Sequence, residues 1–292
     1  MTTFAVLLAL AAAVCWALAM VLGKLGLQWM GLVTYSTVRP LLGLLFVVPY
    51  GLVSAGFENP GAHLVVVAIL GGFLDSFIAA LLFRLALTRN PAHKVTALSL
   101  TSPFWGVVAA VLILGERPPW VVFVAAILVV TGAVFLVDRR RHSPQADGPF
   151  WGVPVSLSAG IIWGISETIP TKYCLTHGMT PLTYQLILVA TAAVCGGIVA
   201  IVYRSTKRPL RFSWRGLGIA LFTAFMSFFL GWRLWLSGLA LAPASLLAPV
   251  HGSMALFAFL FSVLLLRERP SRRASIGVAL TFAGVFIASV LG

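Results

Sequence analysis

Leu112–Trp120 reads LILGERPPW, an apolar run that ends in a Glu-Arg pair and two prolines. A second copy of this phrase, LLLRERPSR, begins at Leu264, which places its glutamate 152 residues after the first. Proline stops a helix because it lacks an N–H and its ring clashes with the preceding turn. Each phrase therefore predicts a structural helix end with a charged pair, formed by Glu116 with Arg117 and by Glu268 with Arg269.

The composition of the chain predicts a membrane protein. Of its 292 residues, 60% are hydrophobic and only 9% are charged, whereas a soluble domain has roughly 25% charged residues. Lipid offers no hydrogen-bond partner to the backbone, so only helices and closed barrels span a bilayer. The apolar runs are long and continuous rather than short and alternating, which favours helices. The expected fold class is all-α integral membrane.

Ten apolar runs are long enough to cross a bilayer as helices, which takes about 20 residues each. They cover approximately residues 4–23, 32–54, 63–84, 92–114, 119–137, 151–171, 182–203, 214–237, 243–266 and 273–291. The first positive charge, Lys24, follows the first run. A signal peptide begins with a basic region, so this run is expected to be a retained helix.

The net charge of +13 is distributed in the way expected of membrane-protein loops. Sixteen Lys and Arg residues lie in or beside the loops after the odd-numbered runs, and the other loops hold two, Arg117 and Lys172. Positively charged loops face the cytoplasm. The chain is thus predicted to cross the bacterial inner membrane several times, with both termini on the non-cytoplasmic side. The expected partners are lipid and a small-molecule substrate, not nucleic acid.

The two Glu-Arg phrases belong to a longer internal repeat. At the same offset of 152 residues, Gly132 matches Gly284. At an offset of 147, Trp16 in AVCWA matches Trp163 in GIIWG. Each half holds five runs, an odd number, so the second copy must cross the membrane in the opposite sense, as in many secondary transporters. The predicted domains are two inverted five-helix repeats, residues 1–142 and residues 143–292.

These halves, with LILGERPPW…TGAVFL in one and LLLRERPSR…AGVFIA in the other, resemble the EamA repeat of the drug/metabolite transporter superfamily over essentially the whole chain. Arg39 and Pro103 of the first half also match the family pattern, but the second half lacks both. The resemblance implies a ten-helix transporter whose halves are not functionally equivalent. Within the superfamily, the chain is most similar to bacterial exporters of the YddG type, which implies aromatic amino acids as substrates.

Ionisable residues inside apolar runs are costly and indicate function. Asp75 lies near the middle of the third run, and Glu167 lies toward the outer end of the sixth. Asp75 is expected either to face a polar cavity and bind an amine or a proton, or to be kept protonated or hydrogen-bonded between helices. Glu167 is expected in the same site, or as a partner of Lys172. Arg39 and Arg233 also lie within runs, and for Arg233 the sequence leaves a cavity-facing and an interfacial position open.

His251 lies between Pro249 and Gly252, a spacing that predicts a locally loosened helix whose backbone groups can meet a ligand. A packed histidine is the alternative. Trp16 and Trp163 are flanked by small residues at helix-contact spacing, so they are expected either to pack between helices or to line a central cavity. The predicted substrate-binding residues are Trp16, Trp163, Asp75, Ser76, Ser99, Ser166, Glu167, His251 and Ser253.

The predicted function is a secondary transporter that exports small amphipathic metabolites by alternating access around a cavity between the repeats. Aromatic or other neutral amino acids are the leading substrate class, and lipophilic cations or toxic compounds are the alternative. No hydrolase, metalloprotease or phosphate-binding motif is present, so an enzyme is not expected, nor is a cofactor or a metal. A channel or an intramembrane enzyme is a less favoured class. A monomer suffices to build the site, although an oligomer remains open.

Overall fold

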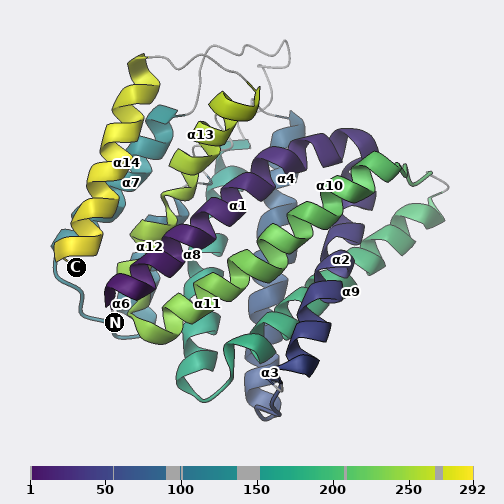
Figure 1. Cartoon of the computed structure of the whole chain (residues 1–292), viewed down its shortest axis with the longest axis horizontal. Helices are drawn as coiled ribbons and strands as arrows, with labels where there is room; N and C mark the ends of the chain where they lie inside the picture. Colours follow the sequence, from purple (N-terminus) through teal and green to yellow (C-terminus); the bar gives the residue numbers. More distant parts are fainter. Residues whose placement is uncertain are drawn as a thin grey trace.

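The computed structural model of the protein consists of helices joined by short loops in the residues that it describes, which are 2–54, 56–89, 99, 101–136, 152–206, 209–266 and 272–291. The helices lie side by side in one bundle, and the two chain termini lie at the same end of the view (Figure 1). Glu268, Arg269 and the predicted boundary between the halves at residues 142 and 143 lie outside the described residues.

The described helices of the first half are α1 (Thr2–Met30), α2 (Leu32–Val53), α3 (Ala62–Gly72), η1 (Phe73–Ala79), α4 (Ala80–Arg89), α6 (Ser102–Ile113) and α7 (Val121–Leu136). Those of the second half are α8 (Gly152–Thr176), α9 (Pro181–Ser205), α10 (Trp214–Ala224), η2 (Phe225–Gly231), α11 (Trp232–Leu241), α12 (Ala244–His251), α13 (Met254–Leu266) and α14 (Arg272–Leu291). The segments η1 and η2 are π-helices that continue their neighbours without a break.

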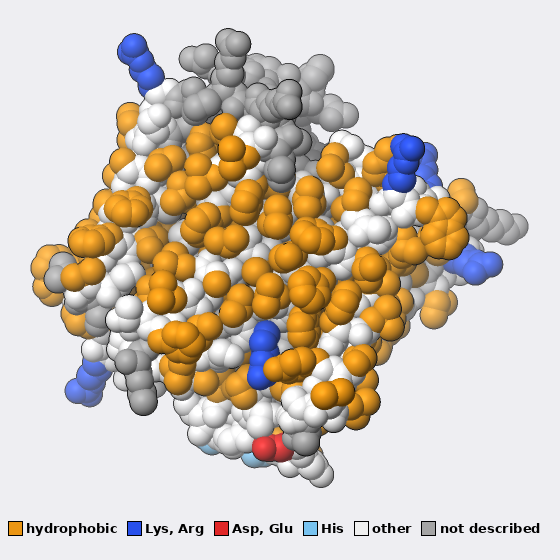
Figure 2. Space-filling view, viewed as in Figure 1, with side chains coloured by type: hydrophobic (Ala, Val, Ile, Leu, Met, Phe, Trp, Pro, Cys, Tyr) orange, Lys and Arg blue, Asp and Glu red, His pale blue; other side chains and the backbone are white. Residues whose placement is uncertain are grey.

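Six helical segments in the described part of the chain are long and apolar enough to cross a membrane, and three shorter helices are also apolar. Apolar side chains cover most of one face of the molecule, while Lys and Arg lie mainly at its edges (Figure 2). Many large apolar side chains point outward on these helices, among them Leu45, Val194, Ile201 and Phe282. Such a surface fits lipid, and the protein is a multi-pass membrane protein. The count of ten spans stays a prediction.

The helices of each half pack mainly against helices of the other half. α1 contacts α10, η2 and α11, and α8 contacts α3, η1 and α4. α2 packs on α9 and α7 packs on α14. α7 and α14 approach closely because Gly132 and Gly284 have no side chains. A Cβ on Gly132 would meet the backbone of Thr281, and a Cβ on Gly284 would meet the backbone of Ala125. Small residues of this kind let membrane helices approach each other.

The two π-helices lie at equivalent positions of the halves, because Phe73–Ala79 and Phe225–Gly231 are separated by the same 152 residues as the glutamates. A π-helix replaces i→i+4 bonds by i→i+5 bonds and is frequent at functional sites. In η2, the side-chain amide of Gln185 on α9 donates to the carbonyls of Phe228 at 2.8 Å and Phe229 at 2.7 Å. A buried polar side chain from a neighbouring helix thus satisfies the shifted backbone.

Glu116, in the phrase LILGERPPW, reaches across to the second half. Its two carboxylate oxygens accept the backbone N–H groups of Ala244 at 2.9 Å and Ser245 at 2.8 Å, which begin α12. A carboxylate at a helix N-terminus satisfies free donors and favours the helix dipole. Arg117 is exposed. Glu116, which follows the end of α6, therefore binds the start of α12.

Candidate functional site

The candidate site is built around α8, which carries Trp163, Ser166 and Glu167. α8 lies close to α6 because Gly164 has no side chain, and a Cβ there would collide with the carbonyl oxygen of Ser102. Glu167 lies one turn further along α8. The absence of a side chain at Gly164 thus allows the carboxylate of Glu167 to sit between helices of the bundle.

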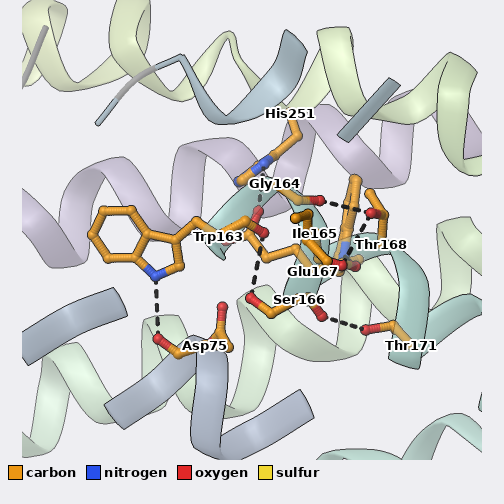
Figure 3. Close-up of polar contacts among 10 residues, drawn as sticks. Asp75, Trp163, Gly164, Ile165, Ser166, Glu167, Thr168, Thr171 and His251 are labelled. Atoms are coloured by element: carbon orange, nitrogen blue, oxygen red, sulfur yellow. Dashed lines mark hydrogen bonds and ion pairs between the residues drawn. The ribbon is translucent and has the colours of Figure 1, made fainter. Parts of the chain in front are cut away.

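Glu167 pairs with His251, whose Nδ1 lies 3.3 Å from its Oε2 (Figure 3). The side chain of Glu167 is 16% exposed and that of His251 is 6% exposed, so the histidine is buried and the glutamate is partly buried. The Trp235 indole N–H donates to the backbone carbonyl of Glu167 at 3.1 Å. His251 ends α12, and α13 begins at Met254, so the helix is interrupted where the sequence predicts a loosened segment.

Asp75 lies in the π-helix η1 and is 6% exposed. Its Oδ2 accepts a hydrogen bond from Ser76 at 2.7 Å, while Oδ1 has no hydrogen-bond partner among the described residues. Ser166 and Glu167 of α8 are close enough to interact with this carboxylate. Figure 3 shows Asp75 and His251 on opposite sides of the α8 segment that carries Ser166 and Glu167.

The two tryptophans matched by the repeat bind equivalent backbone atoms. The Trp16 indole N–H donates to the carbonyl of Ser227 at 3.3 Å, and that of Trp163 donates to the carbonyl of Asp75 at 3.2 Å. Asp75 and Ser227 are 152 residues apart, one in each π-helix. Each indole therefore ties the first helix of one half to the π-helix of the other half.

Trp16 also contributes an aromatic wall beside the Glu167–His251 pair. Its ring centroid lies 4.7 Å from that of His251 and 6.2 Å from that of Trp235, both in edge-on geometry. Trp163 instead contacts Phe83 at 5.3 Å. An edge-to-face pair such as Trp16–Trp235 is favourable by about 0.5–1.5 kcal/mol beyond the area that it buries. The two predicted aromatic residues are thus in different surroundings.

A small pocket opens between α6, α8, α11 and α12. Its lining residues are Ser102, Pro103, Gly106, Gly164, Glu167, Thr168, Trp235, Ala248 and His251. In this conformation the pocket is too small for an amino-acid side chain. A substrate of that size therefore requires the surrounding helices to move apart.

The remaining polar residues singled out in the sequence have separate environments. Ser99 donates to the carbonyl of Ser156 at 3.1 Å, and Ser166 to that of Trp163 at 3.4 Å. Ser253 is buried beside the helix interruption, and its hydroxyl has no partner among the described residues. Of these serines, Ser166 also lies close enough to Asp75 to interact with its carboxylate.

The Lys and Arg side chains near the site contact groups other than the Glu167 carboxylate. Lys172 donates to the carbonyls of Leu239 at 2.6 Å and Ala242 at 2.8 Å, so the alternative Glu167–Lys172 pair does not form. The Arg39 guanidinium lies 4.9 Å from the Phe228 ring centroid, and that of Arg233 lies 5.4 Å from the Tyr50 ring centroid. Within the described ranges, no group of three or more His, Cys, Asp or Glu side chains is arranged to hold a metal ion.

Sequence reasoning did not identify Trp235, Gln185 or Tyr184, which complete the surroundings of the site. Tyr184 accepts a hydrogen bond from Thr171 at 3.0 Å, and its ring lies 6.5 Å from that of Trp232. A signal was present for Gln185, because a lone amide in the apolar run TYQLILVA needs a buried partner. Trp235 carried no such signal, since an aromatic ring in an apolar run is usual in a packed helix.

Comparisons with known proteins consistently find transporters. The EamA-like transporter family matches twice, over residues 3–138 and 150–290. A riboflavin transporter of Rhizobium johnstonii is 28% identical over 160 residues, and the match covers 54% of this chain and 48% of that protein. An uncharacterized transporter of Archaeoglobus fulgidus is 23% identical over 97% of this chain and 96% of its own length. A crystal structure at 15% identity superposes with a TM-score of 0.81 over 98% of this chain and 96% of that one, which shows a shared fold.

Proposed function

Because the chain belongs to the EamA-like transporter family, we propose that it is a secondary transporter that exports small amphipathic metabolites. Aromatic and other neutral amino acids are the leading substrate class, as in exporters of the YddG type. The proposed architecture is ten membrane spans in two inverted halves, residues 1–142 and 143–292, in the bacterial inner membrane.

The observation that carries this proposal is the combination of buried Asp75 and His251 with partly buried Glu167, beside the Trp16 and Trp235 rings. A neutral amino acid needs an anionic partner for its ammonium group, a donor for its carboxylate and an apolar wall for its side chain. The two carboxylates offer the first, and His251, whose Nε2 has no partner among the described residues, offers the second. The tryptophan rings offer the third, because aromatic faces and edges suit an aromatic ligand.

The proposed mechanism is alternating access, in which one half rocks against the other around this site. The contacts of α1 with η2 and of α8 with η1 supply the moving surfaces. Since the pocket between α6, α8, α11 and α12 is small, substrate enters only after those helices separate. The site is then exposed to one side of the membrane at a time.

The test is counterflow in proteoliposomes with radiolabelled compounds. The panel contains phenylalanine, tryptophan, a small neutral amino acid, riboflavin and a quaternary amine. We expect saturable counterflow of the aromatic amino acids, reduced at least several-fold in Trp16→Ala, Trp163→Ala and Asp75→Asn. Trp214→Ala is the matched control, because Trp214 is 79% exposed. If all three site variants transported as well as the wild type, this site would be wrong.

A second candidate is export of lipophilic cations, favoured by buried carboxylates next to aromatic rings, a combination that attracts organic cations. Counterflow of the quaternary amine without that of amino acids would select it. The relative named as a riboflavin transporter motivates the flavin in the panel. Non-saturable flux without counterflow would indicate a channel, and a chemically altered product would indicate an enzyme.

A further inference from the structure

Asp75 is a buried carboxylate whose charge is not balanced by any described cation. Its Oδ1 atom has no hydrogen-bond partner among the described residues, and its Oδ2 atom accepts from the neutral hydroxyl of Ser76 at 2.7 Å. The hydroxyl of Ser166, which is also neutral, lies close enough to interact with the same carboxylate. An isolated ionised carboxylate in an apolar interior is unfavourable. It becomes stable when a counter-charge lies beside it or when it binds a proton and loses its charge. Asp75 is therefore placed to take up a cation.

The ionisable groups described around Asp75 do not supply that cation. Glu167 approaches it from α8 and Tyr184 from α9. Glu167 is already paired with His251. The described cations on surrounding helices bind other groups: Lys172 the carbonyls that end α11, Arg233 the Tyr50 ring, Arg39 the Phe228 ring and Arg273 the Phe135 ring, while His63 on α3 is exposed.

Charge balance then defines what Asp75 can accept. If His251 carries a proton, its pair with Glu167 has no net charge, and an ionised Asp75 would then leave one net negative charge in the site. A proton on Asp75 removes this charge. A substrate ammonium group balances it equally well. Both cannot bind at once, because an ammonium group needs the ionised carboxylate.

The repeat limits the molecule to one such carboxylate at this level. The residue equivalent to Asp75 in η2 is Ser227, which carries no charge. The two π-helices receive the same indole hydrogen bond, from Trp163 and Trp16, so their backbones are held alike. The difference between the halves at this point is thus chemical: of the two equivalent π-helix positions, only that of Asp75 offers a carboxylate to a cation.

We propose that Asp75 binds a proton and the ammonium group of the substrate in alternation, so that each substrate molecule leaves in exchange for one proton. This inference rests on the proposed export function. In the cytoplasm-facing state the ammonium group binds the carboxylate, and the carboxyl proton passes to cytoplasmic water. In the outward-facing state the ammonium group departs, and a proton from outside binds an Asp75 carboxylate oxygen. The only bond made and broken is that O–H bond.

Proton binding is tested on the purified protein without substrate. Infrared spectra in lipid should show the carbonyl band of a protonated buried carboxylic acid at neutral pH. The band is expected to vanish in Asp75→Asn and to persist, shifted in frequency, in Asp75→Glu. Glu116→Gln is the control, because it removes a carboxylate that already has two backbone donors. A band unchanged in Asp75→Asn would overturn the assignment.

Coupling is tested in proteoliposomes that contain a pH-sensitive dye. Imposing a substrate gradient should move protons in the opposite direction, with a ratio of one proton per substrate in the wild type and in Asp75→Glu. In Asp75→Asn that ratio falls to zero, whatever its residual rate of substrate movement. Substrate movement without proton movement in the wild type would overturn the coupling and leave the export function standing. Failure of every compound in the panel would overturn the export function and the coupling with it, while the infrared result still decides whether Asp75 holds a proton.

Discussion

At the scale of single residues, Gly231 decides how the Trp16 indole meets η2. A Cβ on Gly231 would lie 2.9 Å from the Trp16 Nε1 atom and 2.9 Å from the Met226 carbonyl oxygen. We expect Gly231→Ala to displace the indole from Ser227, because overpacking costs about 1–3 kcal/mol. Helix propensity returns at most about 1 kcal/mol. The thermal unfolding midpoint should fall by about 2 °C or more, and substrate counterflow should fall several-fold.

Gly218→Ala is the matched control for this substitution. Gly218 lies on the same continuous α10–η2–α11 segment, and nothing lies within 4 Å of the Cβ that it would acquire. Its midpoint should stay the same or rise slightly. Equal effects at the two positions would mean that helix propensity, and not the contact with Trp16, governs the result.

Several residues of the candidate site are recognisable in the sequence, but their partners are not. Asp75, Glu167 and His251 stand out because charged or polar groups are rare in apolar runs. The sequence suggests Lys172 as a partner for Glu167 because the two residues are close along the chain. In the structure His251, 84 residues later, takes that place. Such a pairing depends on which helices are neighbours, and that information lies in the packing of the whole bundle.

At the scale of the elements, the start of α12 depends on Glu116. Glu116→Ala removes the acceptors of the Ala244 and Ser245 N–H groups, which are partly buried. Losing a charged hydrogen-bond partner costs about 1.5–3 kcal/mol, so we expect the unfolding midpoint to fall by several degrees. Glu116→Gln keeps one acceptor, so its unfolding midpoint should fall less. Scanning fluorimetry in detergent measures both.

Glu58→Ala is the control for the Glu116 variants, because the Glu58 side chain is exposed. It should leave the midpoint unchanged. A midpoint that did not move in Glu116→Ala would show that α12 begins without this carboxylate. The repeated phrase would then mark only a helix end.

The helical fold class was predictable, but the π-helices were not. Apolar runs of about 20 residues predict membrane helices from composition alone. The change to π geometry at Phe73–Ala79 and Phe225–Gly231 has no such signature, because it depends on groups outside the segment. Gln185 and the two indoles, all from other helices, bind the carbonyls of these turns. Local sequence therefore predicts the helix and leaves its irregularity to tertiary contacts.

At the scale of the whole molecule, the first helix of each half packs against the equivalent segment of the other half. α1 packs along the segment that contains η2, and α8 packs along the segment that contains η1. The EamA-like family also matches each half separately. Both observations support the proposed pair of inverted repeats. The repeat itself was visible as an offset of 152 residues, whereas its orientation in the membrane rests on the distribution of Lys and Arg.

Inversion makes a prediction that labelling can decide. Gln28 and His177 are exposed at the ends of α1 and α8, the first helix of each half. If the halves are inverted, these equivalent ends face opposite sides of the membrane, with Gln28 in the cytoplasm and His177 outside. Each is changed to cysteine in a protein whose Cys15, Cys174 and Cys195 are replaced by alanine. A membrane-impermeant maleimide should label His177→Cys in intact cells and Gln28→Cys only after permeabilisation.

Two further positions separate inversion from orientation. Arg117→Cys, in the exposed loop before α7, should label like His177→Cys, and Ser205→Cys, at the end of α9, should label like Gln28→Cys. Reversal of all four results would keep the inverted repeat and place the termini in the cytoplasm, against the positive-inside rule. Labelling of Gln28→Cys and His177→Cys from the same side would contradict inversion itself. In that case the equivalent indole bonds to Asp75 and Ser227 could not arise from halves related by a twofold axis in the membrane plane.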